Sequence, residues 1–192
     1  MTFPISNIIA NQVAVSRGNQ IETISTWGKH FSIEADITIN TKPNNWCNVF
    51  HFTKGGDNWR QHGNRIPSMW LHKDNKFYIM HSVQGNSNHY SRHSVNYGQK
   101  FHLLVHQYQN SNGKDYFEIK IDNQSVHLIE NTDARDWSNV KVYVSDPWYI
   151  SFGEHGTIEN FVYCGGCGSP GTSLSNGERT FINCNPTSPI AT

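Results

Sequence analysis

The most informative part of the chain is Val140-Lys-Val-Tyr-Val-Ser-Asp-Pro-Trp-Tyr149, followed by Gly156-Thr-Ile-Glu-Asn-Phe-Val-Tyr163. In the first segment three valines alternate with lysine, tyrosine and serine, which is the period-two pattern of a strand with one buried face. The Asp-Pro pair then ends the strand, because proline has no N–H to donate and restricts the residue before it. Trp148 and Tyr149 are therefore expected in a loop at the rim of a sheet, and the second segment is expected to form a closing strand.

Similar alternation recurs along the chain, whereas no segment shows the 3.6-residue apolar period of a helix over two or more turns. Turn residues separate neighbouring runs, as at Lys73-Asp-Asn75, where asparagine tolerates a positive φ. The other strands are predicted at residues 31–40, 46–53, 68–72, 76–83, 89–95, 101–109, 116–121 and 125–129. Short strands at this spacing predict an all-β, two-sheet antiparallel sandwich over residues 1–163. Residues 164–192, which contain three cysteines, are expected to form an irregular tail packed on this domain or trailing from it.

The composition excludes several kinds of partner. A chain of 192 residues is long enough for one domain with a hydrophobic core. Aromatic residues make up 12% of it, and each can bury a large area in that core. Lys+Arg and Asp+Glu both number 15, so the chain lacks the basic excess typical of nucleic-acid binding. No apolar run reaches membrane length, which argues against membrane insertion. Residues 1–10 lack the pattern of a secretion signal, so we expect either a different route or a signal absent from this chain.

Eleven histidines raise the question of a metal site or a pH switch. Only His89 and His93 show a suggestive spacing, and no third ligand accompanies them, whereas zinc sites group their ligands more tightly. Imidazoles on the solvent-facing positions of strands are the simpler interpretation, so the sequence does not predict a histidine metal site.

The cysteines are Cys47, Cys164, Cys167 and Cys184. The Cys-x-x-Cys pair lacks the second pair of a zinc ribbon and the βαβ unit of a thioredoxin-like site. The simpler interpretation is at least one disulfide in the tail, since Cys184 with Cys164 or Cys167 would close a loop of about twenty residues and stabilise by roughly 3 kcal/mol. The remaining cysteine either pairs with Cys47 or both stay as buried, inert thiols. A disulfide indicates an oxidising compartment, and hence an extracellular, secreted protein.

The loop from Gly55 to Arg65 is the first candidate binding segment. Sugar recognition needs planar amides and carboxylates that hold vicinal hydroxyls, together with an aromatic face for the apolar side of the ring. This loop offers both, and functional residues concentrate on such segments. The candidate residues are Asp57, Asn58, Trp59, Arg60 and Asn64. The alternative is a polar loop whose side chains bond its own turns, with Trp59 packed on the domain.

Asp146, Trp148 and Tyr149 form the second candidate. In a binding role, the two rings would stack on a sugar and Asp146 would accept hydroxyls or bind calcium. The alternative, which we favour for Asp146, is a carboxylate that accepts the backbone amides of its own turn or pairs with Arg65. Calcium also requires about six or more oxygen ligands, and no such series of ligands is visible.

The amide-rich segment from Gln84 to Tyr90 is the third candidate. Asn86 and Tyr90 would border a glycan site there. The alternative, which the sequence slightly favours, is a Gly-Asn turn that joins two strands.

The segments 48–56, 65–70, 82–88 and 140–149 resemble the concanavalin A-like jelly-roll superfamily, and more narrowly laminin-G-like and pentraxin-like modules of extracellular invertebrate proteins. The resemblance covers roughly residues 31–163 and is most specific at Ser145-Asp-Pro-Trp-Tyr149. It implies a jelly roll of two curved antiparallel sheets that often binds glycans, often with calcium at the rim. Asn64 stands where relatives carry an acidic residue, which weakens the case for calcium, and the tail cysteines match no known pattern.

The sequence therefore predicts a non-enzymatic, lectin-type protein that binds glycans or glycoproteins, with no required cofactor and calcium as an open alternative. A single shallow site would be weak, which favours several copies or a homo-oligomer. The alternatives are a laminin-G-like adhesive module that contacts proteins, and a polysaccharide lyase or hydrolase. Glu118 and Asp122 would lie about 13 Å apart on a strand, too far for the carboxyl separation of about 5–5.5 Å in retaining glycosidases, so hydrolysis is disfavoured.

Overall fold

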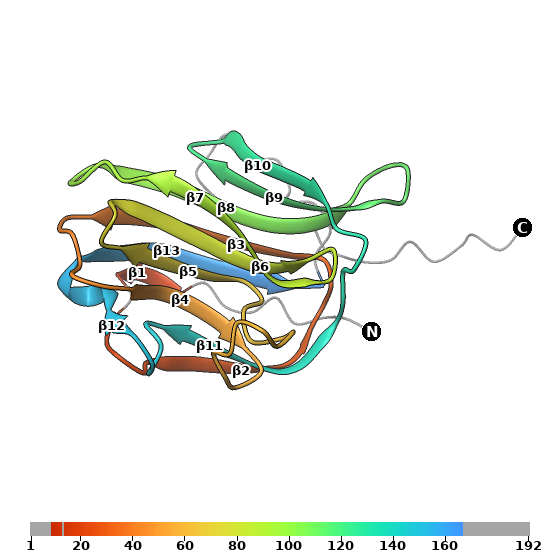
Figure 1. Ribbon diagram of the computed structural model, residues 1–192, viewed down its shortest axis with the longest axis horizontal. Helices are drawn as coiled ribbons and strands as arrows, with labels where there is room; N and C mark the ends of the chain where they lie inside the picture. Colours follow the sequence, from red (N-terminus) through yellow and green to blue (C-terminus); the bar gives the residue numbers. More distant parts are fainter. Residues whose placement is uncertain (1–8, 13, 167–192) are drawn as a thin grey trace, which may run out of the picture.

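The computed structural model describes residues 9–12 and 14–166 as two β-sheets packed face to face (Figure 1). The six-stranded sheet has the order β1-β13-β3-β8-β9-β10 and the seven-stranded sheet the order β2-β11-β4-β5-β6-β7, with β12 parallel to β4 and every other pair antiparallel. The six-stranded sheet consists of β1 (Ile9–Gln12), β3 (Phe31–Ile39), β8 (Lys100–Gln109), β9 (Asp115–Ile121), β10 (Gln124–Glu130) and β13 (Gly156–Gly165). The other sheet consists of β2 (Gln20–Trp27), β4 (Cys47–Thr53), β5 (Ser68–His72), β6 (Lys76–Val83), β7 (Asn86–Ser94), β11 (Trp137–Val144) and β12 (Ile150–Ser151).

The strands predicted from alternation are all present, with bounds shifted by three residues or fewer. Asn75 has a φ of 63°, as the β5–β6 turn requires, and Asp122 and Asn123 adopt similar values in the β9–β10 turn. The only helix in the described ranges is the 3-10 turn Phe152–Glu154, and no helix there is long and apolar enough to cross a membrane. The all-β, two-sheet prediction is therefore confirmed.

Strands β1 and β2 and the two-residue β12 were not predicted. In β2 only Ile24 and Trp27 are buried, and the remaining side chains are polar or partly exposed. This strand lies at the edge of the seven-stranded sheet and pairs with β11 alone. An edge strand can carry polar residues on its exposed positions, so its alternation is too weak to be recognised in the sequence.

The core between the sheets is built from alternating side chains with a large aromatic share. Val140, Val142 and Val144 are completely buried in it, as their spacing predicts. Trp27 packs on Phe52 with ring centroids 4.8 Å apart, so residues from different strands of the same sheet meet inside the sandwich. Aromatic rings thus fill the interior of a chain that is only 36% hydrophobic.

A second apolar cluster covers the opposite, outer face of the seven-stranded sheet. Trp70 of β5 packs there with Tyr78 and Met80 of β6, and Trp46 and Tyr149 lie against them. Neighbouring residues on both strands point into the core, so these strands are covered on both faces. The outer cluster forms the floor of the site described below.

Cys47 is buried and its thiol is free, which corrects its inclusion among the disulfide cysteines. Burial, reinforced by the nearby Asp146 carboxylate, raises the pKa of Cys47 to about 12, so it is an inert thiol at neutral pH. Cys164 lies in β13 and is not a free thiol. Cys167 and Cys184 lie outside the described residues, as does the rest of the predicted tail, so the tail and its connectivity stay predictions.

His81 of β6 is a buried histidine between the sheets. Its ring stacks on Phe117 at 4.7 Å, and its Nε2 lies 3.3 Å from the Gln107 side-chain oxygen. Burial lowers the pKa of His81 to about 3, and its Nδ1 is buried without a partner. The folded protein therefore holds this imidazole neutral.

The free energy of unfolding is expected to decrease as the pH is lowered from about 6.5 to about 3. In this range His81 takes up a proton in the unfolded chain but not in the folded protein. Between these two pH values this one group changes the free energy of unfolding by up to roughly 1.4 kcal/mol per pH unit, and above pH 6.5 its effect on the slope disappears. His81→Phe keeps the stacking and should flatten the slope in urea denaturation series at several pH values. His155→Phe, at a histidine outside the core, serves as the control, and equal slopes in both variants would contradict the assignment.

Candidate functional site

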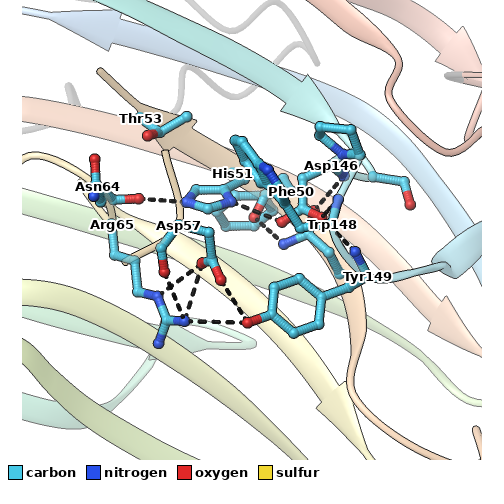
Figure 2. Close-up of polar contacts among 12 residues, drawn as sticks. Phe50, His51, Thr53, Asp57, Asn64, Arg65, Asp146, Trp148 and Tyr149 are labelled. Carbon is cyan, nitrogen blue, oxygen red and sulfur yellow. Dashed lines mark hydrogen bonds and ion pairs between the residues drawn. The ribbon is translucent and has the colours of Figure 1, made fainter. Parts of the chain in front are cut away.

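A polar cluster joins β4, the loop after β4 and the loop after β11 (Figure 2). At its centre, His51 Nδ1 lies 2.8 Å from Asp146 Oδ2, and His51 Nε2 lies 2.5 Å from the Asn64 carbonyl oxygen. A carbonyl oxygen can only accept, so Nε2 carries a proton and a second proton lies between Nδ1 and Asp146. Both side chains are 0% exposed. The pair is therefore a closed hydrogen-bonded unit that solvent does not reach.

Asp146 also fixes the aromatic loop that follows it. Its Oδ1 accepts the backbone N–H groups of Trp148 and Tyr149, both at 3.0 Å, and its own N–H donates to the Asn48 side chain. These are the backbone bonds expected of an Asp-Pro turn, so the structural interpretation of Asp146 agrees with the geometry. The expected alternative partner, Arg65, lies elsewhere in the site.

Arg65 forms an ion pair with Asp57 on the outer face of the sheet. The Asp57 Oδ1 accepts from Arg65 Nε at 3.1 Å and Nη2 at 3.0 Å, while its Oδ2 accepts from the Tyr149 hydroxyl at 2.5 Å (Figure 2). Arg65 Nη1 donates to Asn88 at 2.7 Å, and the guanidinium lies 4.5 Å over the ring of Trp70. The charge of Arg65 is thus balanced, and its donors are occupied by protein groups.

Burial, followed by the hydrogen bond to Asp57, raises the pKa of Tyr149 well above its usual value. The phenol therefore stays protonated at neutral pH and donates to the carboxylate.

A groove of about 490 Å³ opens above this ion pair. Two of its aromatic side chains are about half exposed, Trp59 at 49% and Tyr90 at 52%, while Trp70 at the floor of the groove is buried. The lining residues are Trp46, Trp59, Arg65, Trp70, Tyr78, Met80, Asn88, Tyr90 and Tyr149. An aromatic groove with a few fixed polar groups at its floor is the usual form of a small-molecule site.

Three of the sequence candidates meet in this groove: Trp59 from the β4–β5 loop, Tyr90 from β7 and Tyr149 from the loop after β11. Asp57 lies beside them, bound to both Arg65 and Tyr149. These residues come from three separate parts of the chain, and the fold brings them together.

The remaining loop candidates make local contacts. The Asn58 side chain accepts the N–H of Arg60, and the guanidinium of Arg60 lies 4.6 Å over Trp59. The Asn64 side chain donates to Asn58 O and Gln61 within its own loop. These contacts hold the loop that presents Trp59. Asn86, in the third segment, accepts the N–H of Asn88 at the β6–β7 turn.

Trp148 lies outside the groove. Its ring packs edge-on against His51 and Tyr143, and its exposed part lines a neighbouring hollow of about 330 Å³ with Arg17, Trp46 and Tyr149. It therefore covers the buried histidine and borders a second, more polar surface.

The sequence did not identify Arg65, Trp70, Tyr78 and Asn88 as site residues. For Trp70 and Tyr78 the only available signal was the alternation in β5 and β6, which places both residues on the same face of neighbouring strands. Asn88 faces Arg65 only because β7 pairs with β6. Such contacts depend on strand register, which one sequence does not reveal.

No protein-family model matches this sequence, and no curated protein matches it. Among solved structures, the chain is similar to a mutant of HCR/D, with a TM-score of 0.55, 10% identity and coverage of 84% of this chain and 41% of that chain. It is also similar to the heptameric SAP-like pentraxin of Limulus polyphemus (TM-score 0.48, 13% identity, 84% and 73% covered). A third similar structure is the sialidase of Trypanosoma rangeli (TM-score 0.48, 13% identity, 70% and 20% covered).

The chain spans only a fifth of the sialidase and two fifths of HCR/D. At such identities the similarity concerns the fold alone. The chain has the concanavalin A-like jelly-roll fold, so the fold that the resemblance implied is confirmed, while the narrower likeness to laminin-G-like and pentraxin-like modules stays a prediction.

Proposed function

We propose that this protein binds glycans in the aromatic groove without acting on them. The observation that carries the proposal is the pair of half-exposed rings, Trp59 and Tyr90, above a floor of fixed polar groups. Rings of this kind pack on the apolar side of a sugar, while Asn88 and the Asp57–Arg65 pair are positioned near its hydroxyls. The site is open, so a single copy binds weakly and function relies on several copies or a homo-oligomer.

A glycan array probed with multimerised protein tests this proposal. We expect carbohydrate binding that free ligand competes away. A folded protein that binds no glycan at high density would instead favour the alternative of an adhesive module that contacts proteins.

The groove is less suited to a lyase or hydrolase. A general base works best with a pKa near the operating pH, whereas the Tyr149 phenol is held protonated. His51, the nearest imidazole to Asp57 in the cluster, is 0% exposed and bonded through both nitrogens. Turnover of soluble polysaccharide that is lost in Tyr149→Phe would contradict the proposal.

Calcium is not required in this proposal. The oxygens of Asp146 already accept two backbone N–H groups and face His51, so binding an ion would break these bonds. We expect glycan binding and the melting temperature to be unchanged by EDTA. A melting temperature that falls in EDTA and recovers with added calcium would show that an ion is needed.

We also propose an extracellular location. Disulfides persist in oxidising compartments, and Cys164 is not a free thiol. Mass spectrometry of peptides from the unreduced protein tests the disulfide on which this proposal rests. The expected result is a link between Cys164 and a tail cysteine.

A further inference from the structure

Two histidines face each other across the gap between the sheets. His89 belongs to β7 and His127 to β10, which are the edge strands of the two sheets and both lie at the top of Figure 1. Their Nε2 atoms are 3.0 Å apart, and the ring centroids are 5.1 Å apart. No strand pairing joins β7 to β10, so this contact is a side-chain bridge between the sheets.

The separation of the two nitrogens is close to that of two ligands on one metal ion. Nitrogens bound about 2.0–2.1 Å from a tetrahedral zinc lie roughly 3.4 Å apart, so shifts of a few tenths of an ångström would admit the ion. Burial lowers the pKa of both imidazoles, and for His127 the nearby His89 adds to this. Both rings are therefore neutral at pH 7, which is the state that binds metals.

We propose that His89 and His127 together bind one divalent transition metal of the kind that prefers imidazole, such as zinc, nickel or copper. Both residues are partly exposed, so water can fill the remaining coordination positions. The bound ion links the edges of the two sheets and stabilises the folded state, because the unfolded chain does not hold the two rings together. This site is separate from the groove and independent of glycan binding.

Within the described ranges, one group of three candidate donors also lies close together, His51 with Asp57 and Asp146. It is the weaker candidate, because each of its donor atoms already has a protein partner. The two Nε2 atoms of the histidine pair, in contrast, bond only each other in the part of the chain that the structure describes.

The test measures thermal unfolding of the full chain after removal of metals with a chelator. Saturating zinc or nickel should raise the melting temperature by roughly 5 °C, whereas magnesium and calcium should leave it unchanged. Titration calorimetry with nickel should give one site per chain. His89→Gln and His127→Gln should each abolish both effects, while His155→Gln, at a partly exposed histidine whose ring bonds Thr41, should retain them.

Several outcomes would overturn the proposal. The first is an absence of metal-dependent stabilisation in the wild type, which would leave the pair as a hydrogen bond between imidazoles only. The second is a nickel isotherm and melting shift that persist in His127→Gln. Melting temperatures without metal show whether each variant is folded, and cobalt absorption of the wild type and of both variants gives a readout that does not depend on stability.

Discussion

Replacing Asp146 with alanine is expected to lower the free energy of unfolding by about 3–5 kcal/mol, the usual effect of removing one member of a buried charged pair. The change leaves the N–H groups of Trp148 and Tyr149 without an acceptor, and His51 loses the partner of its Nδ1. Unpaired buried groups of this kind each cost about 1–3 kcal/mol. Urea denaturation measures the loss.

Asp146→Asn separates hydrogen bonding from charge. The amide oxygen can accept the same two backbone N–H groups, and its NH₂ can donate to Nδ1 of a neutral His51 whose Nε2–H still reaches Asn64 O. We therefore expect the asparagine variant to retain most of the stability that alanine loses. Asp133→Ala is the control, since Asp133 is a partly exposed carboxylate that pairs with the exposed Arg135 and accepts the N–H of Gly85, and should change stability by less than about 1 kcal/mol. An Asp146→Ala protein as stable as this control would contradict the role assigned to the pair.

The fold could be predicted from the sequence because its signals are local. Alternation at Val140, Val142 and Val144 identifies a strand and its buried face, and Asn75 identifies a turn by tolerating a positive φ. The edge strand β2 was missed because partial exposure permits a mixed sequence, so burial imposes no clear period there.

The site was predicted only in part, because it depends on contacts between distant segments. Trp59 and Tyr149 stood out as aromatic residues in polar loops, and both reach the groove. Asn58 and Asn64 stood out equally, yet their side chains bond their own loop. Amides suit turns and ligands alike, so their residue type does not decide between the two roles.

Arg65 illustrates the contacts that sequence reasoning could not supply. The carboxylate near it in the expected arrangement was Asp146, whereas the structure pairs it with Asp57. The choice follows from the course of the β4–β5 loop and from the pairing of β6 with β7, which brings Asn88 to its other nitrogen. Once the guanidinium is surrounded in this way, it serves as a fixed floor for the groove.

Removing the two exposed rings of the groove is the strongest test of glycan binding. Trp59→Ala and Tyr90→Ala should each weaken binding about tenfold, which is about 1.4 kcal/mol and within the range for burying an aromatic side chain. The rings belong to different elements, so the double variant should weaken binding roughly a hundredfold if their contributions add. Glycan titration against the immobilised protein measures these changes. Both side chains are about half exposed, so stability should change little.

Tyr97→Ala is the matched control for the loss of an exposed aromatic ring. Tyr97 is 41% exposed, its hydroxyl donates to Asn75 in the β5–β6 turn, and its ring does not line the groove. Binding should survive this change, since no groove residue depends on that ring. Equal losses in all three variants would mean that general surface contacts hold the glycan, while full binding by the folded double variant would move the site away from the groove. The neighbouring hollow lined by Trp148 would then be the next surface to test, because it carries the other exposed tryptophan of the described chain.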